Sequence, residues 1–267
     1  MKNYLFIVEG PHDIAAISKY LKLHDYKMIQ LKEKVPSYWK DLIPKSYPLP
    51  DGDILKRVPV PTFFKSKSND KTIAIYSAGS DNKIVPATNT TLTLLNLKDD
   101  ALKELRTVGI FCDADDKLAK ERYTNLMLEF EKDLDIEFKS IIQNHSFGEV
   151  TQNQGHKFGV YIFPDNSNQG VLEDLLLEGA QSNYLEVMNY AKDYANQIES
   201  ENLDYIKTNN LIGSERKKML VGVIANALKP GKANQVSIQD NHWINHNTLE
   251  NNRIQSAFKN FLEKMLD

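Results

Sequence analysis

The fold of this chain is constrained most by a pattern that occurs three times: a short apolar run followed by a carboxylate. The runs FIV, GIFC and GVYIF lead to Glu9, to Asp113 with Asp115, and, after a proline, to Asp165. Runs of this length that are rich in β-branched and aromatic residues are typical of buried strands. We therefore predict three buried strands with acidic residues at their carboxyl ends.

Helical segments separate these strands. Pro11 suits the first turn of a helix, and Ile14, Ile17 and Leu21 form one apolar stripe, which predicts a helix from 11 to about 23. We predict strands at 3–8, 72–77, 107–112, 136–142 and 157–163, and further helices at 90–105, 117–133, 171–178, 184–199, 215–228 and 251–266. Strands that alternate with helices favour an α/β Rossmannoid fold, with a mainly parallel sheet flanked by helices.

Residues 24–71 interrupt this alternation. Six of the ten prolines lie there, at 36, 44, 48, 50, 59 and 61, and ten Lys or Arg against six Asp or Glu give a net charge of +4. We predict an irregular insertion with a hairpin. Its lysines and aromatic residues could bind a nucleic-acid backbone and stack on bases. The alternative is a solvated loop layer with a small aromatic core. The aromatic residues are Tyr38, Trp39, Tyr47, Phe63 and Phe64.

Composition excludes several classes of protein. The net charge of −3 over 267 residues excludes a generally basic nucleic-acid coat, although local patches can still bind nucleic acid. The single cysteine, Cys112, excludes an intramolecular disulfide, and we expect it to be a small buried apolar residue. No apolar run approaches the roughly 18 residues of a membrane span, and no signal-peptide pattern is present. We expect a cytoplasmic protein without a membrane partner.

The acids that follow the strands are expected to converge, because the carboxyl ends of parallel strands share one edge of a sheet. Clustered carboxylates resist ionisation, and a divalent cation such as Mg²⁺ or Mn²⁺ removes that conflict. Asp113 and Asp115 can reach the same ion if the extended backbone continues through Ala114. Any one of these acids could instead be a helix cap or a solvated turn. Together they favour a metal site.

Several motifs resemble the Toprim signature. VEGPHD at 8–13, followed by DAD at 113–115, resembles the metal-binding α/β domain of type IA and type II topoisomerases, bacterial primases and nucleases of the overcoming-lysogenisation-defect class. GIFCDADDKLAKERY at 109–123, GVYIFPDNSNQGVLEDLLLE at 159–178 and KPG at 229–231 look like a small, mostly bacterial family of uncharacterised Toprim-like proteins. The resemblance implies one Toprim-like domain over 1–267, with an insertion at about 24–71 and a helical extension at about 180–267.

The resemblance also implies roles for individual residues. Glu9 would contact the reacting group or an ion, Asp113 and Asp115 would bind Mg²⁺, and Asp165 and Glu173 would help to hold a second ion. A later basic residue, Lys217 or Lys218, would assist the phosphate, and we take Lys218 as the catalytic candidate. The candidate substrate-binding residues are Gly10, Asp13, Gly79 and Asn166.

These features predict a metal-dependent phosphoryl-transfer enzyme, a Toprim nuclease that cleaves DNA or RNA with Mg²⁺ or Mn²⁺. The alternative is a Toprim-fold binding or regulatory module of a multi-protein assembly, such as a phage-defence system, that is inactive alone. Such a module would have a protein partner, for example an ATPase, or form a homo-oligomer. A fragmentary primase-like nucleotidyl transferase is a third option. No tyrosine lies in a topoisomerase nucleophile context, which argues against religation.

Three histidines are further candidates for a binding role. His242 and His246 are spaced as on one helix face, but two histidines fall short of the ligands that zinc needs, which favours a structural role in a turn-like segment. His12 lies beside Glu9, where it either supports the helix start or contacts a phosphate.

Overall fold

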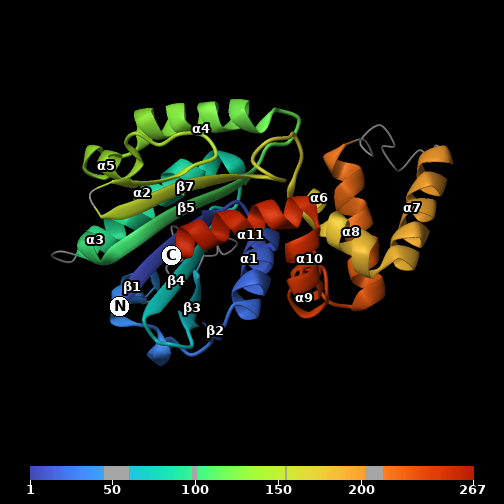
Figure 1. Cartoon of the computed structure of the whole chain (residues 1–267), viewed down its shortest axis with the longest axis horizontal. Coiled ribbons are helices and arrows are strands. Elements are labelled where there is room, and N and C mark those ends of the chain that lie inside the picture. Colours follow the sequence, from blue (N-terminus) through green and yellow to red (C-terminus); the bar gives the residue numbers. More distant parts are fainter. Residues whose placement is uncertain (45–59, 98–100, 154, 202–212) are drawn as a thin grey trace, which may run out of the picture.

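The computed structural model describes residues 1–44, 60–97, 101–153, 155–201 and 213–267. In these residues a mixed sheet has the strand order β2-β3-β4-β1-β5-β7-β6 (Figure 1). Its strands are β1 (Lys2–Val8), β2 (Tyr26–Ile29), β3 (Thr62–Ser66), β4 (Lys71–Ser77), β5 (Leu105–Asp113), β6 (Val150–Asn153) and β7 (His156–Phe163).

The four central strands, β4, β1, β5 and β7, run parallel, whereas β2, β3 and β6 pair antiparallel to their neighbours. The register places Val8 opposite Ser77 and Phe111, and Asp113 opposite Phe163. The carboxyl ends of all four central strands therefore lie at one edge of the sheet. The predicted strands at 3–8, 72–77, 107–112 and 157–163 are confirmed, each within a residue or two of its bounds.

Helices cover both faces of the sheet. They are α1 (Pro11–Leu23), α2 (Ile84–Asn96), α3 (Ala101–Glu104), α4 (Ala119–Asp133), α5 (Lys139–Ile142), α6 (Leu172–Asn183), α7 (Leu185–Ser200), α8 (Ser214–Leu228), α9 (Asn234–Asp240), α10 (His246–Asn251) and α11 (Arg253–Leu266). One core lies between the sheet and α1, α6, α8 and α11, and the other between the sheet and α2, α4 and α5. Figure 1 shows α4 on one side of the sheet and α11 on the other. This arrangement confirms the α/β class.

The last helix, α11, crosses β5 and β7 at two glycines. A Cβ atom on Gly109 would lie 2.9 Å from Met265 Cε, and one on Gly159 would lie 2.6 Å from Met265 Sδ. The hydroxyls of Tyr4 and Thr107 donate to the carbonyls of Leu266 and Met265. The helix end is therefore bound to the amino-terminal edge of the sheet, opposite the acids.

Several predicted elements need correction. Residues 136–142 are not a strand: a 3₁₀ turn (Ile136–Phe138) leads into α5, and the buried residues Phe138, Ile141 and Ile142 follow helical spacing. The helix predicted at 90–105 starts earlier, at Ile84, and strand β5 already begins at Leu105. Strand β6 and the helices α9 and α10 were not predicted.

The insertion contains more regular structure than predicted. Strands β2 and β3 pair antiparallel, and two 3₁₀ helices (Lys32–Lys34 and Ser37–Leu42) follow β2. The indole of Trp39, fully buried, donates to Thr72 Oγ1 at 2.8 Å. Tyr38, Phe63 and Phe64 are buried too, but Phe64 belongs to one of the two main cores and Tyr38 and Phe63 to the other, so they do not form a separate aromatic core. Tyr47 lies outside the described residues.

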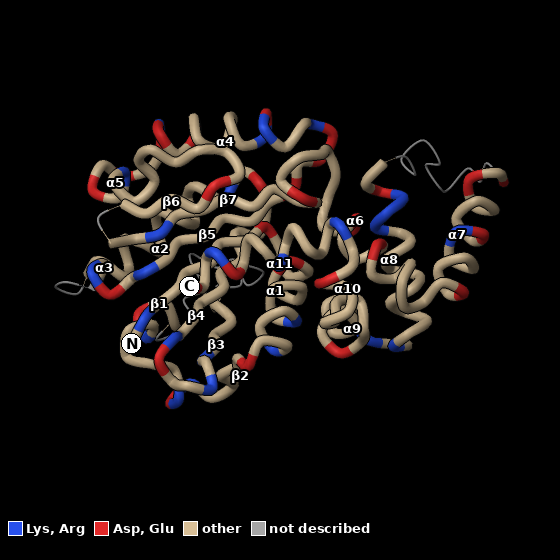
Figure 2. The backbone as a smooth tube through the Cα atoms, viewed as in Figure 1, with Lys and Arg blue, Asp and Glu red and all other residues tan. Residues whose placement is uncertain are grey.

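Acidic and basic residues are interspersed along the chain, as expected for a net charge of −3 (Figure 2). Cys112 is buried as predicted. Among the described helices, none combines the length and the apolar character that crossing a membrane requires.

Candidate functional site

Glu9 follows β1 directly, and Gly10 is the N-cap of α1 with Pro11 at the first helical position. The half-buried Glu9 side chain is not a solvated turn residue, because its Oε1 atom accepts a hydrogen bond of 3.0 Å from the backbone N–H of Asp113. Burial raises the pKa of Glu9, while the Asp113 N–H and the positive charge of Arg122 oppose that rise.

Asp113 is the last residue of β5, the strand beside β1. Its Oδ1 atom accepts a 2.8 Å hydrogen bond from the backbone N–H of Leu172, the first residue of α6. Burial raises the pKa of Asp113 well above its usual range, and the charges of Asp13, Glu9 and Glu173 add to this effect. Two carboxylates thus connect three segments that are far apart in sequence.

Asp13 and Glu173 complete a buried acidic group, at 6% and 4% exposure. Asp13 Oδ2 accepts a 2.7 Å hydrogen bond from the N–H of Gly10 and so caps α1. Burial and then the charge of Glu9 raise the pKa of Asp13 to about 8. Glu173 lies in the first turn of α6, and its Oε1 is 3.7 Å from His12 Nδ1. His12 therefore faces an acid of the site.

Asp115 lies at the rim. Strand β5 ends at Asp113, and the exposed Asp115 adopts a left-handed backbone with φ of 55°. The backbone N–H groups of Ala114 and Asp115 both donate to the carbonyl of Gly170. The extended backbone that would carry both aspartates to one point therefore does not continue. Partial burial raises the pKa of Asp115, and the positive charge of Lys218 opposes this rise.

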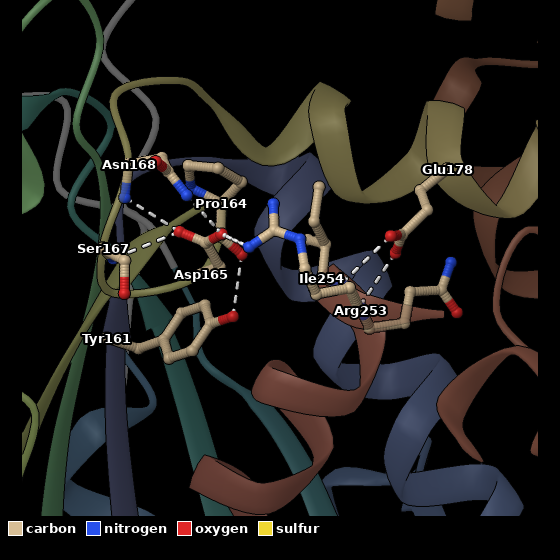
Figure 3. Close-up of polar contacts among 9 residues, drawn as sticks. Tyr161, Pro164, Asp165, Ser167, Asn168, Glu178, Arg253 and Ile254 are labelled. Atoms are coloured by element: carbon tan, nitrogen blue, oxygen red, sulfur yellow. Dashed lines mark hydrogen bonds and ion pairs between the residues drawn. The ribbon is translucent and has the colours of Figure 1, made fainter. Parts of the chain in front are cut away.

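Asp165 belongs to a different polar cluster, which includes Ser167, Asn168 and Arg253 (Figure 3). Asp165 accepts hydrogen bonds from the backbone N–H groups of Ser167 and Asn168, from Asn168 Nδ2, and from Arg253 Nη1 at 2.5 Å. Burial raises the pKa of Asp165, but these hydrogen bonds together lower it. Asn166 Oδ1 accepts from the N–H of Ile162. No described contact joins either side chain to the acids around Glu9. The role of Asp165 as a metal ligand and that of Asn166 in substrate binding remain predictions.

The basic residues of the site lie on α8 and α4. Partial burial lowers the pKa of Lys218, but Glu215, Glu173 and Asp113 outweigh this effect and raise it. Lys218 is therefore within electrostatic reach of the acids, whereas Lys217 forms a 2.8 Å ion pair with Asp174.

Sequence reasoning missed Arg122. This residue of α4 is buried, forms an ion pair with Asp81, and has an Nε atom with no hydrogen-bond partner among the described residues. Burial lowers the pKa of Arg122, and the charge of Glu9 counteracts that effect. An arginine within a charged amphipathic helix normally faces solvent, so no signal in the sequence marks it.

The two glycines predicted to bind substrate, Gly79 and Gly10, differ in whether their positions require glycine. Gly79 has φ of 92°, and its N–H donates to the carbonyl of Glu9 at 2.8 Å. A Cβ atom on Gly10 would meet only Asp13 Oδ2, at 3.7 Å, so this position does not require glycine for space.

Of the predicted site residues, the structure brings together Glu9, Gly10, Asp13, Asp113, Glu173 and Lys218, with Gly79 and Asp115 at the border. In the described part of the chain, no three His, Cys, Asp or Glu side chains are already arranged as a metal site. The arrangement brings carboxylates within electrostatic reach of one another, raises the pKa values of Glu9, Asp13 and Asp113, and places two cationic side chains nearby.

Comparisons with known proteins bear on the family and the fold. The model of a family described as "Protein of unknown function (DUF3226)" matches residues 3–267. The structure is similar to the crystal structure of a hypothetical protein from Pyrococcus horikoshii OT3, with a TM-score of 0.58 and 14% identity, over 100% of this chain and 96% of that chain. That similarity shows the α/β fold alone. No curated protein matches the chain.

Proposed function

Since the chain belongs to the DUF3226 family of proteins of unknown function, we propose its function from its own residues: a metal-dependent phosphoryl-transfer enzyme. In this proposal it is a Toprim-like nuclease that cleaves DNA or RNA in the cytoplasm. The observation that carries the proposal is the group formed by Glu9, Asp13 and Asp113, whose pKa values are all raised. Burying unneutralised carboxylates together costs free energy, which a bound cation recovers.

The residues fit a hard divalent cation. Backbone N–H groups engage Glu9 Oε1 and Asp113 Oδ1, which leaves the second oxygen of each carboxylate for a ligand. Mg²⁺ is commonly bound through one or two carboxylates, with water and substrate phosphate oxygens in its other positions. Two protein ligands therefore suffice, although no set of three is preformed in the described residues.

Glu9 and Asp113 would hold Mg²⁺ or Mn²⁺, with Asp115 and Glu173 next to them. When bound, the ion supplies Lewis-acid polarisation of the phosphoryl group and a more acidic water. The raised pKa of Glu9 favours its protonated form and suits this side chain to donate a proton or, once ionised, to accept one. Lys218 and the buried Arg122 supply positive charge toward a phosphate that approaches the acids.

The test is titration of the protein with Mn²⁺ and Mg²⁺ by calorimetry, paired with cleavage assays on labelled DNA and RNA. We expect Asp113→Asn to weaken metal binding by at least about tenfold and to abolish cleavage, because the variant removes a ligand charge without a change of size. Asp193→Asn, an equal change of charge on the exposed face of α7, should alter neither.

Two outcomes would overturn this proposal. If millimolar metal does not bind the native chain, the acidic group is not a metal site. If Asp113→Asn cleaves as fast as the native chain, the activity comes from elsewhere or from a contaminant.

One observation favours a second candidate, a binding or regulatory module that needs a partner. The absence of three preformed ligands among the described side chains is what a site completed by another molecule would show. The partner would be an ATPase or a second copy of this chain, for example in phage defence. Metal binding by the native chain without cleavage of any nucleic acid would favour this candidate.

A further inference from the structure

A hollow of about 790 Å³ lies at the β2 edge of the sheet, far from the acidic group. Four lysines line it, and none of the described lining residues is acidic. The hollow is bounded by β2, by the end of β3 and by the 3₁₀ helix Lys32–Lys34. Its lining residues are Lys27, Met28, Ile29, Gln30, Leu31, Lys34, Lys65, Ser66, Lys67 and Asn69.

Two of these lysines lie directly opposite each other. Lys27 on β2 and Lys65 on β3 are Cα partners in the antiparallel register, so their side chains project from the same face of the sheet. Like charges in this position destabilise a strand pair. Within the described part of the chain, neither lysine forms an ion pair, whereas Lys67 is paired with Asp25. The repulsion between Lys27 and Lys65 is thus not compensated by a described side chain.

Lys34 adds a third positive charge from the 3₁₀ helix beside β2. Neighbouring strands lie about 5 Å apart, so the opposed lysines and Lys34 bring several positive charges to the hollow rather than one. A nucleic-acid duplex carries one negative charge for roughly every 1.7 Å of its axis, and proteins bind it with several lysines or arginines that neutralise its phosphates. Lysine is a point charge on a flexible side chain, whereas the planar guanidinium of arginine binds one phosphate in a fixed geometry. A site built from lysines therefore suits phosphates whose exact positions vary.

The aromatic residues of the same region argue against recognition of bases. Trp39, Phe63 and Phe64 are buried in the core, so they cannot stack on unpaired bases. What remains available to a ligand is the charge of the lysines.

We propose that the hollow lined by Lys27, Lys34 and Lys65 binds the phosphate backbone of a nucleic acid, without preference for sequence. This binding is separate from the acidic site. Lys65 pairs with Thr72, and Thr72 with Asn3, while Glu9 lies six residues further along the direction of β1. At about 3.3 Å per residue the two sites are roughly 20 Å apart. Substitution of the lysines therefore leaves the acidic group intact.

The test is binding of a fluorescently labelled DNA duplex, followed by anisotropy in EDTA over a series of salt concentrations. EDTA removes divalent cations, so binding is measured without catalysis. We expect Lys27→Gln combined with Lys65→Gln to weaken binding about tenfold or more. The negative slope of log K against log salt should become smaller in magnitude by about 2, because two phosphate contacts are lost. Duplexes of unrelated sequence should bind equally.

The matched control is Lys120→Gln combined with Lys132→Gln, which removes two charges from the exposed face of α4. If both double variants weaken binding equally, the effect is one of total charge and the hollow is not a site. The proposal is also overturned if the native chain does not bind DNA, or if only vesicles that contain phosphatidylserine bind in a Lys27- and Lys65-dependent manner.

These results are distinguishable from those of the nuclease test. Asp113→Asn should abolish cleavage and retain DNA binding in EDTA, whereas the double lysine variant should retain metal binding. A chain that binds metal and cleaves DNA but loses no affinity in the lysine variant would refute this inference alone.

Discussion

At the scale of single residues, Asp13 is the acid whose ionisation has a defined effect on stability. Its pKa of about 8 in the folded chain lies above its ordinary value of 3.8, so the folded state holds the proton more tightly than the unfolded state. The resulting stabilisation is complete below about pH 4 and is lost as the pH rises through about 8. The free energy of unfolding should therefore decrease over this range in the metal-free protein.

We expect Asp13→Asn to remove most of this pH dependence, because asparagine mimics the protonated acid and can still accept from the Gly10 N–H. The change in slope between pH 5 and pH 8 should be on the order of 1 kcal/mol per pH unit. Urea unfolding in EDTA at several pH values measures it. An unchanged slope in the variant would show that other groups titrate.

Asp165 provides a control of opposite sign. Its pKa is lowered in the folded state, so its stabilisation is present above the unfolded pKa and is lost as the pH falls through the folded value. Asp165→Asn should therefore destabilise the chain at neutral pH and have little effect in strong acid, where Asp13→Asn also has little effect.

At the scale of elements, the packing of α6 depends on Gly179. A Cβ atom at this position would overlap the backbone carbonyl oxygen of Trp243, which also accepts a 2.9 Å hydrogen bond from Gln255 Nε2. The backbone cannot move away as a flexible side chain can. The segment before α10 is thus packed against α6 at a distance that only glycine permits.

We expect Gly179→Ala to lower the free energy of unfolding by about 3 kcal/mol, because the added methyl group forces the Trp243 segment away from α6. Gly222→Ala on α8 is the matched control: its Cβ would come no closer than 3.8 Å to Asn234 Nδ2. That substitution should stabilise the chain by up to about 1 kcal/mol, since glycine is a poor helix former. Chemical denaturation compares the two, and equal effects would refute this account.

The elements also show how far the sequence can predict this molecule. The parallel strands can be predicted from the sequence because they are continuous apolar runs. Their carboxyl ends share one edge of the sheet, which brings Glu9 and Asp113 together as expected. The contacts of Asp165 could not be predicted in this way, because its partner Arg253 lies 88 residues away on a helix whose position the pattern does not specify. The ion pair of Arg122 likewise involves a partner that is distant in sequence, Asp81, the first residue of a 3₁₀ helix (Asp81–Lys83).

The prediction of a strand at 136–142 is wrong for a different reason. IEFKSII at 136–142 alternates as a strand does, yet the side chains of Phe138, Ile141 and Ile142 reach one core only when the backbone is helical. A short run carries too few residues to distinguish the two periods. Tertiary packing decides between them.

At the scale of the whole molecule, α11 packs across one face of the sheet and is hydrogen-bonded to several of its strands. Its residue Met265 occupies the space left by Gly109 and Gly159, and the carbonyls of its last turn accept from Tyr4, Thr107, Lys71 and Lys157. The chain's last helix therefore connects strands β1, β4, β5 and β7 at once.

We expect Met265→Ala to lower the free energy of unfolding by roughly 3 kcal/mol, because the two glycines beside it cannot fill the cavity that remains. Lys264→Ala, at an exposed position of the same turn, should change it by less than about 0.5 kcal/mol. Thermal unfolding of both variants measures the difference. A small effect of Met265→Ala would mean that α11 shifts to close the cavity.

The hydrogen bonds of Glu9 and Asp113 have a consequence for how this family can vary. Both carboxylates are held by main-chain donors, the N–H groups of Asp113 and Leu172, rather than by other side chains. Every amino acid except proline carries such a donor. Residue 172 can therefore be replaced by other apolar residues of similar size without loss of the hydrogen bond to Asp113. The orientation of the two carboxylates thus depends on the path of the backbone and not on which side chains surround them.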